Sequence, residues 1–283
     1  ELEYQMRIQF LHAETVWLPD LDKKDKGSVG ALLLGIVILS DWIASSDYFA
    51  QAETWFCQPD AQEHAVHLAK TFLTISGLES QPAEWEQEFH QVWPSISREG
   101  MRGLQAETEM LFEQAQERIS VVLLEAPMGE GKTEAGIYAA LQMARQWGKY
   151  GFYVGLPTAA TSNQMVGRMR TFLQMHHASE PVRLLHSMAW LNDERRPSFC
   201  PDFDTEEERY AWRWLLPVRR GLLGSYAVGT VDQAMMSVLL VKYGVLRLLG
   251  LAEKALIIDE LHSYDVYMSE ILHRLLEWCK VLE

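Results

Sequence analysis

A glycine-rich turn between two apolar stretches constrains the fold of this chain more than any other feature of its sequence. The run SVVLL at 120–124 has the composition of a strand, and residues 133–147 have the apolar spacing of a helix. The turn between them contains Gly129 and Gly131, which let the backbone bend tightly. A strand, a glycine-rich turn ending in GKT and a helix predict a phosphate-binding loop in a parallel sheet that is covered by helices.

Each residue of the predicted loop has a role in holding ATP with Mg²⁺. Backbone N–H groups of Gly129, Glu130 and Gly131 would converge on a phosphate, and the N-terminus of the following helix adds partial positive charge. Lys132 would reach the β and γ phosphates, and Thr133 would hold the Mg²⁺ ion. The alternative is an ordinary strand-to-helix turn, which the complete GKT ending disfavours.

A pair of adjacent acids follows a second apolar run. Residues 255–258 predict a buried strand, which ends directly in Asp259 and Glu260. Ligands of parallel sheets bind at the carboxyl ends of the strands. We expect Asp259 to hold Mg²⁺, while Glu260 orients and deprotonates the attacking water. An acidic pair alone more often caps a helix, but a phosphate loop in the same domain favours the catalytic interpretation.

The chain divides into three parts by its patterning. Residues 1–93 have helical periodicity without a convincing strand, and residues 94–117 include a linker. Residues 118–283 alternate short apolar runs with longer amphipathic stretches, which is typical of a parallel sheet with helices on both faces. Further strands are expected at 151–156, 182–186, 226–228 and 254–258, and further helices at 163–175, 231–240 and 267–280.

The composition limits the partners of the chain. Its net charge of -14 excludes a generally basic surface, because phosphate binding depends on clustered Lys and Arg, so any DNA contact must be local. The three cysteines, Cys57, Cys200 and Cys279, lie too far apart to suggest a disulfide framework. The longest apolar run, 31–39, is shorter than the roughly 20 residues of a membrane helix. These features predict a cytoplasmic protein without membrane contact.

Four segments together resemble the motor signatures of the Cas3-type helicase-nucleases of type I CRISPR systems. They are GKTEAG at 131–136, LPTAATSNQM at 156–165, VGTVDQAM at 228–235 and LIIDELHSYD at 256–265. The resemblance implies the first RecA-like domain of a DExH helicase that moves on single-stranded DNA with ATP. It also implies a partner, the RNA-guided surveillance complex Cascade, and degradation of the DNA that this complex marks in antiviral defence.

The resemblance also assigns roles to individual residues. Six would line the track that grips one DNA strand by its backbone: Pro157, Thr158, Gln164, Gly229, Thr230 and Gln233. His262 would couple the nucleotide state to this track, and Gln105 would read adenine. The alternative for the threonines and glutamines is that they are caps at strand ends.

The helical first part resembles the last stretch of the family's HD nuclease domain, through GIVILSDWIASSD at 35–47. In this segment Asp41 follows Val37 and Ile38 at helical spacing, so we expect its carboxylate to face the core and to need a partner. The family would make Asp41 a ligand of a transition metal such as Mn, Ni, Co or Fe. A salt-bridged or capping aspartate is the alternative.

The sequence lacks the His-Asp pair that should supply the other nuclease ligands, although it contains lone histidines such as His12 and His64. It also lacks the second RecA-like domain with its arginine finger. We therefore interpret the chain as a fragment, which would bind ATP weakly and hydrolyse little of it alone. Another DExH helicase, acting on RNA or in repair, and a nucleotide-gated docking module are the competing hypotheses.

Aromatic and basic residues interleave at 209–220, in Arg209, Tyr210, Trp212, Arg213, Trp214, Arg219 and Arg220. Bases could stack on such aromatics while arginines hold the backbone. The favoured interpretation is an amphipathic helix that buries its tryptophans, with the acidic residues of 202–208 as its N-terminal turn.

Overall fold

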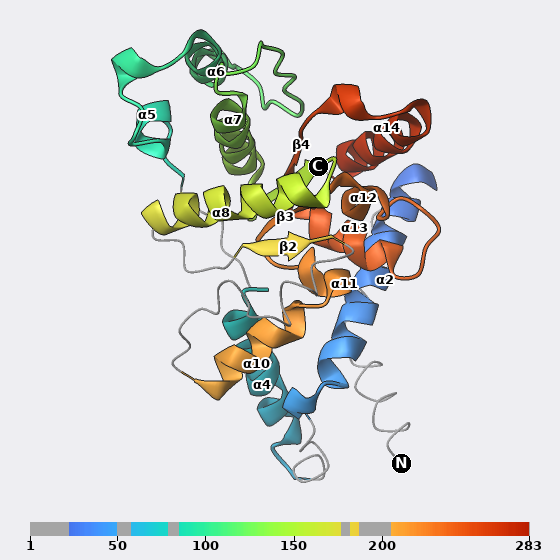
Figure 1. The fold of residues 1–283 in the computed structure, drawn as a ribbon. Helices are drawn as coiled ribbons and strands as arrows, with labels where there is room; N and C mark the ends of the chain where they lie inside the picture. Colours follow the sequence, from blue (N-terminus) through green and yellow to red (C-terminus); the bar gives the residue numbers. More distant parts are fainter. Residues whose placement is uncertain (1–22, 50–57, 79–84, 177–181, 187–204, 283) are drawn as a thin grey trace.

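The computed structural model describes residues 23–49, 58–78, 85–176, 182–186 and 205–282. Its centre is a parallel four-stranded sheet in the order β2-β3-β1-β4 (Figure 1). The strands are β1 (Gly151–Leu156), β2 (Arg183–Leu185), β3 (Tyr226–Thr230) and β4 (Lys254–Ile258). Gly155 pairs with both Gly229 and Ile258, so the carboxyl ends of β3, β1 and β4 lie at one edge of the sheet.

Helices cover both faces of this sheet, as the alternation of side chains along β1 requires. Phe152 and Val154 lie in one core with α7 (Lys132–Trp147) and α8 (Ala159–Met175). Tyr153 lies in the opposite core with α12 (Val231–Met235), α13 (Gly244–Ala252) and α14 (Val266–Val281). The predicted fold class, an α/β sheet with helices on both faces, is confirmed.

The remaining helices lie outside these two layers. Helix α6 (Gly103–Gln114) packs on α7, and the short segments α5 (Phe89–Val92) and η2 (Arg98–Gly100) precede it. The helical first part contains α2 (Lys23–Ala44), η1 (Asp47–Phe49) and α4 (Ala61–Ser76). Between β2 and β3 lie α10 (Glu206–Leu215) and α11 (Val218–Gly221), and η3 (Leu261–Ser263) follows β4.

A third hydrophobic cluster joins the helical first part to α10. The rings of Phe72 in α4 and Trp214 in α10 meet edge to face, with centroids 5.3 Å apart, and Trp214 is 6% exposed. Thr205 caps α10, and three glutamates fill its first turn. The predicted amphipathic helix is confirmed, but of its two tryptophans Trp214 is buried and Trp212 is only half-buried.

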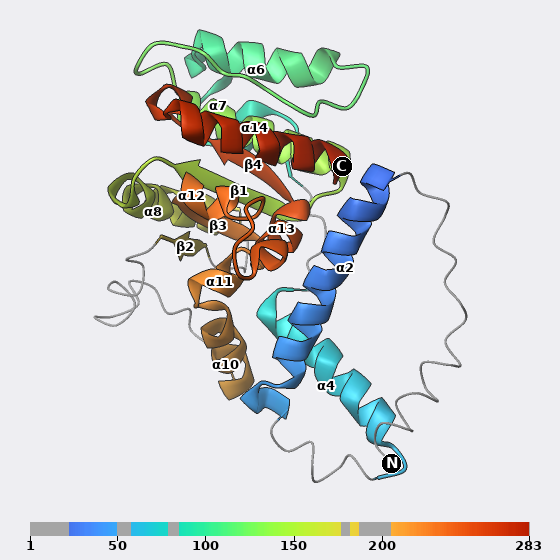
Figure 2. The same ribbon diagram turned by 90° about the vertical axis from the view of Figure 1, so that its right-hand side faces the viewer.

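Helix α2 runs beside α13 and crosses toward α4 (Figure 2). A Cβ at Gly35 would lie 3.1 Å from both Leu249 Cβ and the Val245 carbonyl oxygen, which shows how closely these helices pack. The stretch Lys26–Ala44 is long and apolar enough to cross a membrane by length and composition, and little of it is buried. One such helix is weak support for a membrane segment, because helices of globular domains have the same composition.

Two expected strands differ from the structure. Residues 120–124 form no strand, and Val121 and Leu123 are 70% and 74% exposed. This segment is instead anchored to α7, whose Gln146 and Trp147 side chains bond the backbone N–H and carbonyl of Ile119. Among the described strands β4 pairs only with β1, so β4 is half-exposed rather than buried.

Candidate nucleotide-binding site

The glycine-rich loop is shaped for an anion. Gly129 and Gly131 have φ of 87° and 73°, in the left-handed region that glycine adopts without strain. Helix α7 starts directly after the loop, and no side chain caps its N-terminus. The free N–H groups of its first turn therefore remain available, and they favour a negatively charged ligand.

Lys132 folds back over this loop. Its Nζ donates to the carbonyl oxygens of Ala126 at 2.6 Å and Pro127 at 3.4 Å. Phosphate oxygens would replace these carbonyls as acceptors, because an ammonium group has only donors to offer. The loop residues thus fit the triphosphate that the sequence predicts.

Gln105 lies against the loop from the first turn of α6. Its side chain is 2% exposed, and its Oε1 accepts from the backbone N–H of Arg102 at 3.0 Å. A Cβ on Gly131 would lie only 2.1 Å from Gln105 Nε2. The expected adenine-reading glutamine therefore adjoins the phosphate loop.

The acidic pair follows β4 in a constrained turn. The Asp259 N–H donates to the Gly155 carbonyl at 3.0 Å, and the Asp259 Oδ1 accepts from the Glu260 N–H at 2.9 Å. Glu260 has a φ of 55°, which costs a residue other than glycine about 1–3 kcal/mol. Its carboxylate lies 3.3 Å from Nε2 of His262, a side chain that is 81% exposed.

Tyr264 closes the turn by donating to the Asp259 carbonyl at 2.9 Å. Burial, followed by the nearby carboxylates of Asp259, Asp232 and Glu260, raises the pKa of Tyr264 to about 12. The phenol therefore stays protonated at neutral pH and remains a donor to the turn.

Helix α7 and strand β4 run in opposite directions, which brings the loop and the acids to one edge. At the far end of α7, the N–H of Tyr150 donates to the Glu253 carbonyl at 2.8 Å, next to the start of β4. The first turn of α7, with Lys132 and Thr133, must then lie toward the end of β4, where Asp259 follows. The arrangement can hold a triphosphate between the loop and the acids.

The six residues predicted for a DNA track lie in or after the last residues of β1 and β3, at the same edge. Thr158 and Gln164 are exposed, and Thr158 also caps α8 by accepting from the Thr161 N–H at 3.2 Å. Thr230 and Gln233 are 8% and 6% exposed, so they are largely buried. Pro157 is half-buried and Gly229 is buried. Pro157 directly follows β1 and Gly229 belongs to β3, so both lie at this edge.

His186 was not predicted as a site residue, although it follows β2 directly. It is 1% exposed, and its Nε2 lies 3.0 Å from Asn163 Oδ1 in α8. The signal in the sequence was a histidine at the end of the expected strand 182–186.

Asp41 does not face the core as expected. The carboxylate is exposed, and so are Leu34 and Val37 on the same side of α2. The helical spacing correctly grouped Asp41 with apolar neighbours, but no described element covers that side. No three His, Cys, Asp or Glu side chains form a metal-binding group within the described residues, and His12 lies outside them.

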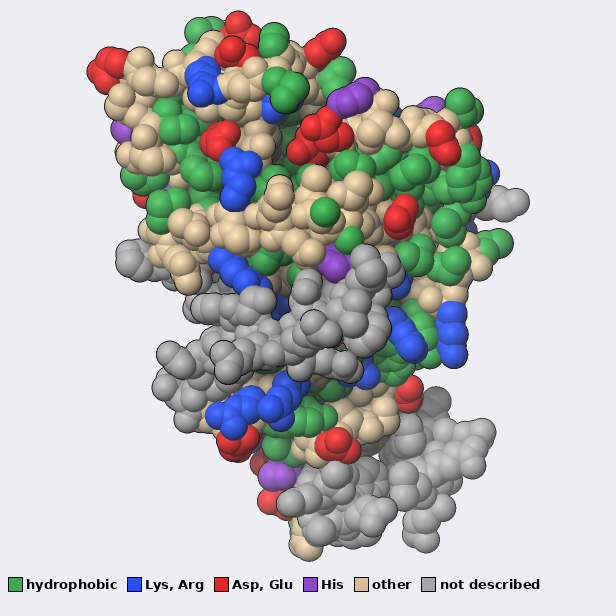
Figure 3. All heavy atoms as spheres, in the orientation of Figure 1, with side chains coloured by type: hydrophobic (Ala, Val, Ile, Leu, Met, Phe, Trp, Pro, Cys, Tyr) green, Lys and Arg blue, Asp and Glu red, His purple; other side chains and the backbone are tan. Residues whose placement is uncertain are grey.

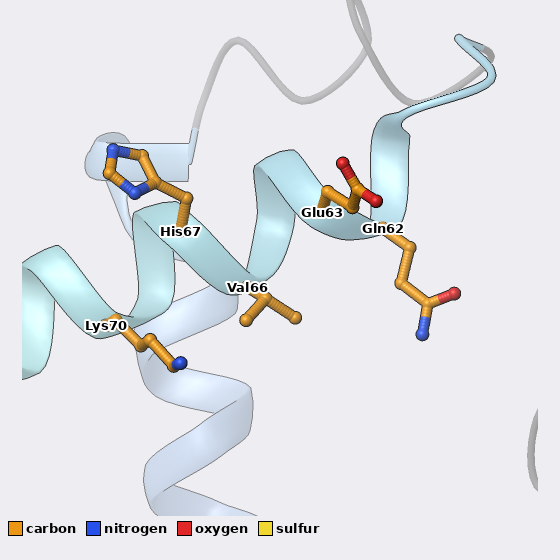
Figure 4. Close-up of a pocket in the computed structure, with 5 residues that line it drawn as sticks. All are labelled: Gln62, Glu63, Val66, His67 and Lys70. Carbon is orange, nitrogen blue, oxygen red and sulfur yellow. The ribbon is translucent and has the colours of Figure 1, made fainter.

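A shallow hollow of about 530 Å³ lies along α4, lined by Gln62, Glu63, Val66, His67 and Lys70 (Figure 4). All five side chains belong to one helix and point in different directions. Because one helix supplies the whole lining, the hollow lacks the converging groups of a ligand site.

The fold is that of a RecA-like α/β domain, with a glycine-rich loop before α7 and an acidic pair after β4. No protein-family model matches the sequence. Curated relatives do match it. The chain is 33% identical over 258 residues to the CRISPR-associated endonuclease/helicase Cas3 of Thermus thermophilus, and 28% identical over 262 residues to that of Escherichia coli.

A solved Cas3 structure is also similar to this chain. The crystal structure of T. fusca Cas3-ADP superposes with a TM-score of 0.76 at 33% identity, over 90% of this chain and 29% of that one. The chain spans 28% of the length of the curated relatives and is homologous to that part of the Cas3 helicase-nucleases. The resemblance predicted from the motifs is confirmed.

Proposed function

We propose that this chain is the nucleotide-binding motor domain of an ATP-dependent single-stranded DNA translocase and helicase. The observation that carries the proposal is the glycine-rich loop at the start of α7 with Gln105 against it. The acidic pair follows β4, at the end toward which we infer that the first turn of α7 lies. The crystal structure of T. fusca Cas3-ADP, to which the chain is similar, supports the same nucleotide class.

Each residue at this edge has a separate role in phosphoryl transfer. Lys132 and the first N–H groups of α7 bind and orient the phosphates, and Gln105 selects adenine. Thr133 and Asp259 would hold Mg²⁺, which when bound neutralises charge on the phosphate oxygens. Glu260 orients the attacking water and accepts its proton.

The polar edge beside the nucleotide would hold one DNA strand by its backbone. Thr158 and Gln164 offer exposed donors there. His262 lies beside Glu260, and it would couple the state of the bound nucleotide to the grip on the DNA strand. Translocation requires a second RecA-like domain, because an arginine finger supplied across the cleft is worth about 10³–10⁵ in rate.

For the complete protein we propose degradation of target DNA in type I CRISPR defence, together with the Cascade surveillance complex, in the cytoplasm. A solved structure named for a CRISPR RNA-guided surveillance complex is 26% identical to the chain, with a TM-score of 0.55. The helical first part would belong to an HD nuclease domain. Asp41 would provide one ligand of its transition metal, but the described residues do not complete such a centre.

Binding of a fluorescent ATP analogue with Mg²⁺ tests the nucleotide site. We expect weak binding by this chain without appreciable turnover, and Lys132→Ala should weaken it about 10- to 100-fold, because a charge-assisted contact is lost. Lys70→Ala, which removes an exposed lysine on α4, should leave the affinity unchanged. Equal affinity in the wild-type and Lys132→Ala chains would refute the site.

A further inference from the structure

Arg247 in α13 is a buried cation for which no described residue provides a carboxylate partner. Its side chain is 7% exposed, and its Nε has no hydrogen-bond partner among the described residues. Burial lowers the pKa of Arg247, with Tyr153 opposing this effect and Arg219 adding to it. Burying a charge without an ionic partner destabilises the folded chain, and an apolar residue at this position would avoid that destabilisation.

Among the described residues, the side chain that Arg247 bonds is that of Gln233, in the first turn after β3. The Arg247 Nη1 donates to Gln233 Oε1 at 3.1 Å, in a buried contact. A guanidinium group has five donors and no acceptor, so it can only face the oxygen of the carboxamide. The amide nitrogen of Gln233, with its two donors, must then face away from Arg247.

The backbone before Gln233 is held from the same side. The Tyr153 hydroxyl, fully buried, donates to the Thr230 carbonyl at 2.8 Å. A Cβ on Gly229 would lie 2.8 Å from this hydroxyl and 2.1 Å from the Leu185 carbonyl oxygen. The backbone at Gly229 and Thr230 is therefore tightly held, and the bond from Arg247 holds the oxygen end of the Gln233 amide.

We propose that Arg247 is a positioning residue, which turns the amide nitrogen of Gln233 toward a bound single strand as a fixed donor to a phosphate oxygen. The inference rests on the proposed DNA track. A phosphodiester has only acceptors, so a glutamine with a fixed donor face binds the backbone without selecting a base. A free glutamine would present its oxygen to the phosphate for part of the time.

Anisotropy of a labelled oligo-dT strand with the 283-residue chain tests this role through a double-mutant cycle. Arg247→Met and Gln233→Ala should each weaken binding about tenfold, as expected for one lost hydrogen bond. The double variant should bind no more weakly than the weaker single variant. Arg247→Lys keeps a donor-only cation and should recover part of the affinity. Arg145→Met makes the same charge change in the last turn of α7, away from the proposed track. This control should leave the DNA affinity unchanged.

Two results would overturn the inference while the wild-type chain still binds DNA. Losses that multiply to about a hundredfold in the double variant would show that the residues act independently. A salt dependence reduced by about one phosphate contact in Arg247→Met would show direct contact instead.

Absence of DNA binding by the wild-type chain would refute the proposed track itself. NMR spectra of the Gln233 side-chain amide, recorded without DNA, then decide whether Arg247 orients this amide. We expect Arg247→Met to shift its resonances, and unchanged resonances would overturn the positioning role. Thermal unfolding should show that Arg247→Met folds, because apolar replacement of a buried charge is often neutral or stabilising.

Discussion

Gly131 meets two requirements that another residue would violate together. Its φ of 73° lies in the left-handed region, and a Cβ there would lie 2.1 Å from Gln105 Nε2. We expect Gly131→Ala to displace Gln105 and to weaken MgATP binding at least about tenfold. The strained backbone should also destabilise the chain by about 1–3 kcal/mol. Titration calorimetry and thermal unfolding measure the two effects.

Gly148 provides the matched control at the other end of α7. Its φ is 63°, and nothing lies within 4 Å of the position of a Cβ. Gly148→Ala should cost about 1 kcal/mol of stability and leave nucleotide affinity unchanged. If Gly148→Ala weakened binding as much as Gly131→Ala, the contact with Gln105 would have no part in the effect.

Local sequence was sufficient to predict the tight glycine turn at 129–131 but not the surroundings of Asp41. The conformation of Gly129 and Gly131 follows from residue type, because few other residues adopt positive φ. The side of α2 on which Asp41 lies also follows, from helical spacing. What covers that side depends on elements distant in sequence, so the predicted burial was wrong.

Helix α10 contacts the helical first part through Trp214, and it contacts β2 through the Trp212 carbonyl, which accepts from Arg183 Nη1 at 3.2 Å. We expect Trp214→Ala to destabilise the chain by about 3–5 kcal/mol, because the ring is buried against Phe72 and Leu215. A cycle with Phe72→Ala should give a coupling energy of about 0.5–1.5 kcal/mol for the ring pair. Urea denaturation measures both quantities.

Arg213→Ala serves as the control on the exposed side of α10, where we expect a change within about 0.5 kcal/mol. Hydrogen exchange of α10 should not change when single-stranded DNA is added. Protection of α10 by DNA, or a small effect of Trp214→Ala, would restore the alternative that bases stack on this segment.

Strand pairing was the part of the fold that the sequence predicted least well. The runs at 120–124 and in β4 are apolar enough for buried strands, yet their backbones need neighbours at the right register to form a ladder. Within the described residues, β4 pairs with one strand and the segment 120–124 pairs with none. The predicted helix at 231–240 ends instead at Met235, where the following residues form turns.

The charge of the molecule and the chemistry of the proposed track point to the same mode of DNA binding. The net charge is -14, and none of the six track residues is a cation. Figure 3 shows a band of mostly uncharged surface over α8 with a few Lys or Arg side chains beside it, and others around α10. Two of these arginines have partners: Arg168 in α8 pairs with Glu134, and Arg220 lies over the ring of Trp214 at 4.3 Å.

Binding of a single strand should therefore depend only weakly on salt. Each phosphate neutralised by a cation contributes about 0.7 to the slope of log affinity against log salt for a single strand. Because Thr158, Gln164 and Gln233 are neutral donors that release no counterions, we expect a slope no steeper than about -1.4, the value that two cationic contacts would give. Anisotropy titrations of oligo-dT from about 50 to 300 mM KCl provide the measurement. A slope steeper than about -3 would mean that an arginine-rich surface, rather than the track at the sheet edge, holds the DNA.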